Sequence, residues 1–275
     1  MKSLSQIILV TSFKGGVGKT TVSANVAIRL AQMGNKVLVC DCDLESRCLD
    51  IVLGIENQPL FNICDAVAER CDVSRAIVAD ERYDGLFFMP APAFYPEVFQ
   101  TKDTSDMFTK ENVSAFIDKI SGNYDYIIFD LPARPDMLYR RLINHANTVL
   151  VVSLHTATSI RAAEKTAIAI RELCDTTKAP DVKLVVNGFK ATDVKNGDNI
   201  GLYGIISKTG LPLAGVIPFD SDMVHAQELG ESVPNYKNGR LPFWKAICNI
   251  CKRLEGSNVG LLDGIKVGVN KFKLC

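Results

Sequence analysis

The stretch FKGGVGKTT, residues 13–21, constrains the fold of this chain more than any other part of its sequence. It follows a short apolar run, QIILVTS at 6–12, that is typical of a buried strand, and it precedes a helical pattern. Glycines in such a loop let backbone N–H groups approach an anion closely at the N-terminus of a helix. The stretch therefore predicts a strand–loop–helix unit that binds phosphate groups.

Apolar runs of strand length alternate with helical patterns along the rest of the chain. These runs are continuously apolar, which is typical of strands buried on both faces of a parallel sheet, and they lie at 36–40, 85–90, 124–130, 148–154, 183–187 and 213–218. Helices are expected at 22–33, 60–70, 110–121, 135–145, 158–174, 221–229 and 241–254, with a long irregular connection at 91–110. This order predicts an α/β fold: a doubly wound, mostly parallel sheet flanked by helices.

Composition narrows the class of protein and its compartment. The 275 residues contain 31 Lys and Arg against 31 Asp and Glu, so the formal net charge of zero gives no overall basic field for nucleic acid. The nine cysteines are odd in number and most lie in apolar runs, as expected of free core thiols in a reducing compartment. We find no secretion signal and no apolar run of spanning length, and therefore expect a cytoplasmic protein.

The loop positions have expected roles in binding a nucleotide. Lys19 is expected to contact the β- and γ-phosphates, and the Thr20 hydroxyl to ligate Mg²⁺. Phe13 stands where the general pattern has glycine, and the alternative is a glycine-rich turn without a ligand. The residues expected to line the cradle are Gly15, Gly16, Val17, Gly18, Lys19, Thr20 and Thr21.

Carboxylates follow two of the expected strands. The run KVLVC leads into Asp41 and Asp43, and YIIF leads into Asp130. Parallel strands end at one edge of a sheet, where ligands of such folds bind, so Asp130 suits a position near Mg²⁺. A role for Asp41 or Asp43 as an ordinary turn or capping residue stays open.

The string KGGVGKTT resembles the deviant Walker motif of the MinD/ParA family of P-loop ATPases. The resemblance is to MinD in particular and spans roughly residues 5–254. Weaker similarities continue through segments shared in order along the chain, namely DCDLESRCLD (41–50), DLPA (130–133), TSIRAAEK (158–165), VIPFDSD (216–222) and LGESV (229–233).

The resemblance implies roles that the loop pattern does not. Lys14 would be the signature lysine that reaches the phosphates of the partner subunit, acting as an arginine finger does. Asp43 would orient the attacking water and lie near the metal, and Asp130 would be the Walker B carboxylate. Asn187 would contact adenine, with Pro218 near the base.

The implied function is a switch driven by ATP and Mg²⁺. ATP would form a homodimer, and slow hydrolysis, stimulated by a partner, would dissolve it. A MinD-like protein would position the division site at the inner surface of the cell membrane, together with an activator or inhibitor protein. The alternative is a ParA-like partition or cargo-positioning ATPase that binds DNA non-specifically, for which the zero net charge is unfavourable.

The sequence predicts two parts, a P-loop ATPase domain at 1–255 and a C-terminal tail at 256–275, and the tail is a candidate for membrane binding. On a helical wheel Leu261, Leu262 and Ile265 share one arc with Val269 and Phe272, so the tail is a possible amphipathic membrane-targeting segment on a peripheral protein. Glycines at 260, 264 and 268 oppose a helix by ~1 kcal/mol each.

Two further classes of protein are disfavoured. Cys248 and Cys251 have the spacing of an iron–sulfur ligand pair, but FWKAICNICKRL reads as a helix with these thiols on its apolar face. Bacterial tyrosine kinases share the deviant loop and end in a tyrosine cluster, whereas no Tyr follows Tyr236 here.

Overall fold

The computed structural model of this chain describes residues 5–55, 59–93, 107–174, 179–228 and 233–266. In this described part, eight strands form one sheet in the order β3-β4-β2-β5-β1-β6-β7-β8. Every neighbouring pair is parallel except β3 and β4, which are antiparallel. The strands are β1 (Gln6–Thr11), β2 (Val37–Asp41), β3 (Val78–Ala79), β4 (Leu86–Met89), β5 (Tyr126–Asp130), β6 (Thr148–Leu154), β7 (Asp181–Phe189) and β8 (Leu213–Pro218).

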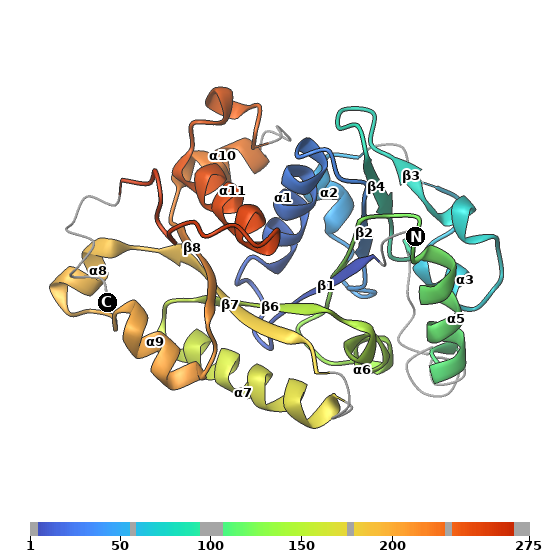
Figure 1. Cartoon of the computed structure of the whole chain (residues 1–275), viewed down its shortest axis with the longest axis horizontal. Coiled ribbons are helices and arrows are strands. Elements are labelled where there is room, and N and C mark those ends of the chain that lie inside the picture. The colour runs from blue at the N-terminus through green and yellow to red at the C-terminus, as the bar shows by residue number, and fades with distance from the viewer. Residues whose placement is uncertain (1–4, 56–58, 94–106, 175–178, 229–232, 267–275) are drawn as a thin grey trace.

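Helices cover both faces of the sheet (Figure 1). Those described are α1 (Lys19–Gln32), α2 (Leu49–Leu53), α3 (Ile63–Val67), α5 (Lys110–Ile120), α6 (Met137–Leu142), α7 (Ala157–Leu173), α8 (Ala191–Asn196), α9 (Leu202–Thr209), α10 (Ser221–Glu228) and α11 (Pro242–Leu254). Helices α1, α10 and α11 lie above the sheet in Figure 1, and α6, α7 and α9 lie below it. No described helix combines the length and apolar character needed to cross a membrane.

The predicted fold class is confirmed, and its elements largely coincide with the expected ones. The central strands are buried along nearly their whole length, which is why their sequences are continuously apolar. The expected helix at 60–70 is only one short helix, α3, and the helices α2, α8 and α9 were not expected. These three are five to eight residues long, too short for a helical period to be distinct from a turn.

Helix α11 approaches β8 closely at Gly215. A Cβ on this residue would lie 2.3 Å from Cγ1 and 2.7 Å from Cδ1 of Ile250, a side chain that is itself 1% exposed. Both distances are far shorter than van der Waals contact, so a side chain at 215 must displace Ile250 and strain the packing of α11 on β8.

We therefore expect Gly215→Ala to destabilise the fold by overpacking, by about 1–3 kcal/mol, which corresponds to a loss of about 3–10 °C in melting temperature. Gly204→Ala is the matched control. It lies within α9 and its Cβ would be 3.4 Å from the nearest atoms, those of Ile200, so melting should be unchanged or raised. Equal melting temperatures for the two variants would contradict the close approach.

Candidate active site

The loop between β1 and α1 has the backbone of an anion cradle. Gly16 and Gly18 have φ values of 72° and 91°, in the left-handed region that favours glycine. Val17 between them is 1% exposed and fixes the loop to the core. Around Gly15 and Gly16, no atom lies within 4 Å of where a Cβ would be, so the outer side of the loop is open to a ligand.

The first turn of α1 supplies the side chains of the cradle. Lys19 is 9% exposed, and no acidic residue accompanies it in this turn. The positive end of the helix and the Lys19 ammonium therefore act together on the space in front of the loop. Thr21 accepts a hydrogen bond of 3.4 Å from the Gln227 amide, which ties this turn to α10.

Asp130 ends β5 directly beneath the same turn. Its carboxylate is 1% exposed and accepts hydrogen bonds from the hydroxyls of Ser23, at 2.8 Å, and Thr20. Burial raises the pKa of Asp130 to about 6, although both hydroxyls and the nearby Lys19 charge act to lower it. A divalent cation held by the Thr20 hydroxyl would relieve this unfavourable burial of negative charge, so these residues fit Mg²⁺.

The two carboxylates after β2 have different environments. Asp41 is fully buried, and its two oxygens accept hydrogen bonds from the backbone N–H of Asp43 and of Leu49, each at 3.0 Å. It therefore shapes the loop between β2 and α2. β2 ends at Asp41, so Asp43 lies in the loop, where it is half-buried and accepts a hydrogen bond from the Ser46 N–H at 3.1 Å.

Register brings these groups to one edge of the sheet. Asp130 pairs with Val10 on one side and with Asp41 on the other. Among the described residues, no group of three or more His, Cys, Asp or Glu side chains is arranged to hold a metal ion. A magnesium site here would thus draw on the Thr20 hydroxyl, Asp130, substrate phosphates and water, as Mg²⁺ sites commonly do.

Lys14 does not point into its own cradle. Its ammonium donates hydrogen bonds to the hydroxyls of Thr158, at 2.8 Å, and Ser159, at 3.0 Å, in the first turn of α7. The two lysines of the loop therefore occupy separate environments. Lys19 is buried beside the phosphate cradle, whereas Lys14 is half-exposed against the first turn of α7.

Asn187 contacts the loop itself. Its amide donates a hydrogen bond of 2.8 Å to the Val17 carbonyl, and its nitrogen lies 2.3 Å from where a Cβ on Gly18 would be. Pro218 ends the neighbouring strand β8, and Phe219 follows it with the Lys190 ammonium 4.6 Å from its ring. Asn187 and Pro218 thus end up at the same edge of the sheet as the loop, the expected place for the base.

Sequence reasoning missed several residues that hold these groups in place. Ser23 is a plain helix residue in sequence, and only the fold reveals it as a partner of Asp130. The contacts of Thr158 and Ser159 with Lys14 span 144 and 145 residues, beyond the reach of any local pattern. The segment 229–232, most of the expected LGESV similarity, lies outside the described residues.

Asp136 is another carboxyl near this edge that was not singled out. It caps α6 by accepting a 2.7 Å hydrogen bond from the Tyr139 N–H. Burial raises its pKa to about 6, with a further contribution from the Asp43 charge. A pKa above the unfolded value of about 3.9 means that its stabilising contribution is complete below pH 4 and is lost as pH rises through 6.

Asp136→Asn retains a capping oxygen and removes the charge. We expect equal melting temperatures near pH 3.5, and at pH 8 an advantage of about 1 kcal/mol for the variant, after allowance for partial solvent screening. Thermal unfolding of both proteins at several pH values measures this difference. A difference that does not change with pH would contradict the raised pKa.

Comparison with known proteins agrees with this geometry. A family described as AAA domain matches residues 5–183. The septum site-determining protein MinD of Bacillus subtilis is 31% identical over 258 residues, covering 94% of this chain and 92% of that protein. MinD of Helicobacter pylori is 33% identical over 230 residues, covering 82% and 83%.

Solved structures extend the comparison to three dimensions. MinD of Aquifex aeolicus has a TM-score of 0.77 at 30% identity, covering 94% of this chain and all of that one, and its MinC:MinD complex has a TM-score of 0.78. An ATP complex of a Cyanothece McdA variant, at 17% identity and a TM-score of 0.73, shares the fold. The chain therefore belongs to the MinD/ParA family of P-loop ATPases, with MinD proteins among its most similar relatives.

Proposed function

We propose that this chain is a MinD-like ATPase switch, in which ATP drives homodimerisation and hydrolysis returns the monomer. The observation that carries this proposal is the separation of the two loop lysines. Lys19 is beside the chain's own phosphate cradle, while Lys14 lies outside it on two neutral hydroxyls. Neither hydroxyl carries a charge to pair with the ammonium, so an anionic phosphate is the stronger partner for Lys14.

The residues of the chain divide the work of phosphoryl transfer. The loop N–H groups and Lys19 bind the β- and γ-phosphates, and Thr20 and Asp130 hold Mg²⁺, which supplies neutralisation of phosphate charge. Asp43 orients the water for in-line attack on the γ-phosphate. Lys14 of the partner subunit stabilises the charge that develops on the transferred group. Asn187 holds the loop through Val17 and lies on the side of the cradle expected for adenine.

The output of the switch is placement of the division site at the inner surface of the cell membrane. Similarity to MinD proteins over nearly the whole chain supports this output. One similar structure is a MinC:MinD complex, so we expect regulation by a partner protein that inhibits division or activates hydrolysis. Turnover by the isolated chain should accordingly be slow.

The ParA-like alternative gains no support from the basic pairs in the sequence. At Lys252-Arg253 the guanidinium is already engaged, because it donates to the carbonyls of Val259 at 2.8 Å and Leu213 at 3.1 Å. At Arg140-Arg141, the second residue donates to the Phe108 carbonyl at 3.4 Å. Neither pair offers two unengaged cations to a phosphate backbone.

Two substitutions separate nucleotide binding from turnover. Lys19→Ala should abolish binding of a fluorescent ATP analogue, because the phosphates lose their buried cation. Asp43→Ala should bind ATP normally, hydrolyse it at least tenfold more slowly, and accumulate as an ATP-dependent dimer. Size-exclusion chromatography with light scattering, in ATP and in ADP, measures the dimer.

Glu81→Ala is the control, because this exposed residue is far from the loop in sequence and belongs to the β3–β4 connection. Normal hydrolysis by Asp43→Ala would contradict the water-orienting role. A monomeric wild-type chain in saturating ATP would contradict the dimer switch.

A further inference from the structure

The chain after α11 turns back along the helix it has just left. Ser257 donates its N–H to the Lys252 carbonyl at 2.9 Å, closing the end of the helix, and the chain then continues as turns. Residues 257–266, the last that the structure describes, form no helix. We call this segment the clasp.

A stripe of polar side chains on α11 binds the clasp. The stripe consists of Lys245, Asn249 and Arg253, spaced four residues apart on one face of the helix. Arg253 donates to the Val259 carbonyl at 2.8 Å, Asn249 to the Asp263 carbonyl at 2.9 Å, and Lys245 to the Gly264 carbonyl at 3.5 Å. The order of these contacts means that the clasp runs antiparallel to the helix.

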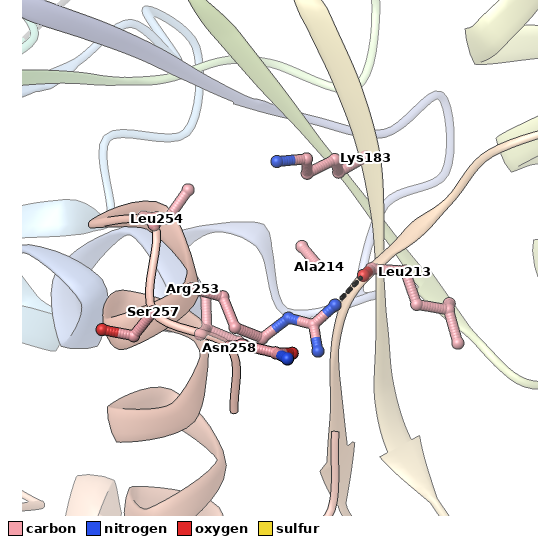
Figure 2. A pocket seen from close by; sticks show the side chains of 9 residues that line it. Lys183, Leu213, Ala214, Arg253, Leu254, Ser257 and Asn258 are labelled. Atoms are coloured by element: carbon pink, nitrogen blue, oxygen red, sulfur yellow. Dashed lines mark hydrogen bonds between the residues drawn. The ribbon is translucent and has the colours of Figure 1, made fainter. Parts of the chain in front are cut away.

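The stripe includes a polar group that needs the clasp. Asn249 is 6% exposed, although it carries a polar amide and the other buried residues of α11 include Ile250 and Cys251. A buried amide without a partner is costly, and the Asp263 carbonyl supplies that partner. Arg253 also donates to the Leu213 carbonyl at 3.1 Å, so one guanidinium joins the clasp, α11 and β8 (Figure 2).

Two clasp side chains are part of the hydrophobic core. Leu262 is 8% exposed and Ile265 is 3% exposed, whereas Leu261 is half-buried against the same cluster. The clasp does not fill the whole seam. Its first two residues, Ser257 and Asn258, line a pocket of about 270 Å³ together with Lys183 and Arg253 (Figure 2).

These contacts conflict with a membrane role for the same residues. Leu262 and Ile265 belong to the apolar arc that an amphipathic tail would insert into lipid, and one side chain cannot lie in the core and in lipid at once. Transfer to lipid would bury these side chains again, but it would leave a cavity in the core and the Asn249 amide without its carbonyl partner, and both changes are unfavourable.

We propose that the clasp is a constitutive part of the ATPase domain that withholds Leu262 and Ile265 from lipid in both nucleotide states. Any membrane contact of this chain then depends on residues other than these two. Of the experiments below, only vesicle pelleting rests on the proposed membrane output. Closure of the clasp and binding of nucleotide are measured separately.

Adjacent leucines provide the variant and its matched control. If the tail is an anchor, Leu261→Ser and Leu262→Ser should reduce ATP-dependent pelleting with phosphatidylcholine–phosphatidylglycerol vesicles alike. If the clasp is closed, Leu262→Ser should lower the melting temperature by roughly 5 °C or more and Leu261→Ser by clearly less. At a temperature where both are folded, neither should change the fraction pelleted.

Hydrogen–deuterium exchange of the unmodified full-length chain tests closure without a substitution. The amides of Ser257, Val259, Asp263 and Ile265 are hydrogen-bonded, so we expect the same protection in ADP, in ATP, and in ATP with vesicles. Loss of that protection with ATP and vesicles, or equal loss of pelleting in the two leucine variants without a melting difference, would overturn the proposal.

Nucleotide binding, measured on the same samples, distinguishes this outcome from failure of the ATPase itself. Wild-type protein that binds ATP but never pellets would refute the membrane output alone, and the melting and exchange results would still decide the clasp.

Discussion

The parallel register of β2, β5 and β1 is the constraint on which the site depends. It places Val10, Asp130 and Asp41 side by side, so the loop that leaves β1 starts beside two buried carboxylates. Their burial raises the pKa of each, to about 6 for Asp130 and about 7 for Asp41. Burying two neighbouring carboxyl groups is unfavourable when both are ionised. Such a pair is typical of a site where a cation binds together with the ligand.

The rest of the site follows from how each carboxylate is used. Both carboxylate oxygens of Asp41 accept hydrogen bonds from backbone N–H groups, and these bonds set the path of the loop that carries Asp43. Asp130 is left with two hydroxyls, which a cation can share. Asn187 holds the loop from β7, which lies on the other side of β1 from β5, by donating a hydrogen bond to the Val17 carbonyl. The cradle is therefore in contact with both β5 and β7 before any ligand binds. Such preorganisation reduces the cost of ordering the site on binding.

How far the sequence could predict this arrangement depends on the range of each interaction. The strand–loop–helix unit and the acidic ends of β2 and β5 are local patterns, and parallel pairing alone is enough to bring them together. The resting place of Lys14 on α7 and the bond from Asn187 to Val17 join residues far apart in the chain, so no spacing rule could indicate them. The antiparallel β3 is only two residues long and has no periodicity to read.

The tail illustrates a different limit. The arc of Leu261, Leu262 and Ile265 is real on a helical wheel, but the glycines at 260 and 264 oppose the helix that the wheel assumes. Tertiary contacts with α11 decide the outcome, because Asn249 and Arg253 bind clasp carbonyls that a continued helix would use internally. An apolar pattern thus identified residues that are buried without identifying what buries them.

The most direct test of the dimer switch is to mix two inactive variants, Lys14→Ala and Asp43→Ala, and to measure ATP turnover. In a mixed dimer, the Lys14→Ala subunit keeps Asp43 and receives an intact lysine from its partner, so one complete site forms if Lys14 acts in trans. Random assortment of equal amounts then restores about a quarter of wild-type turnover. No turnover above that of the separate variants, with mixed dimers present, would mean that Lys14 serves its own subunit and would contradict the account.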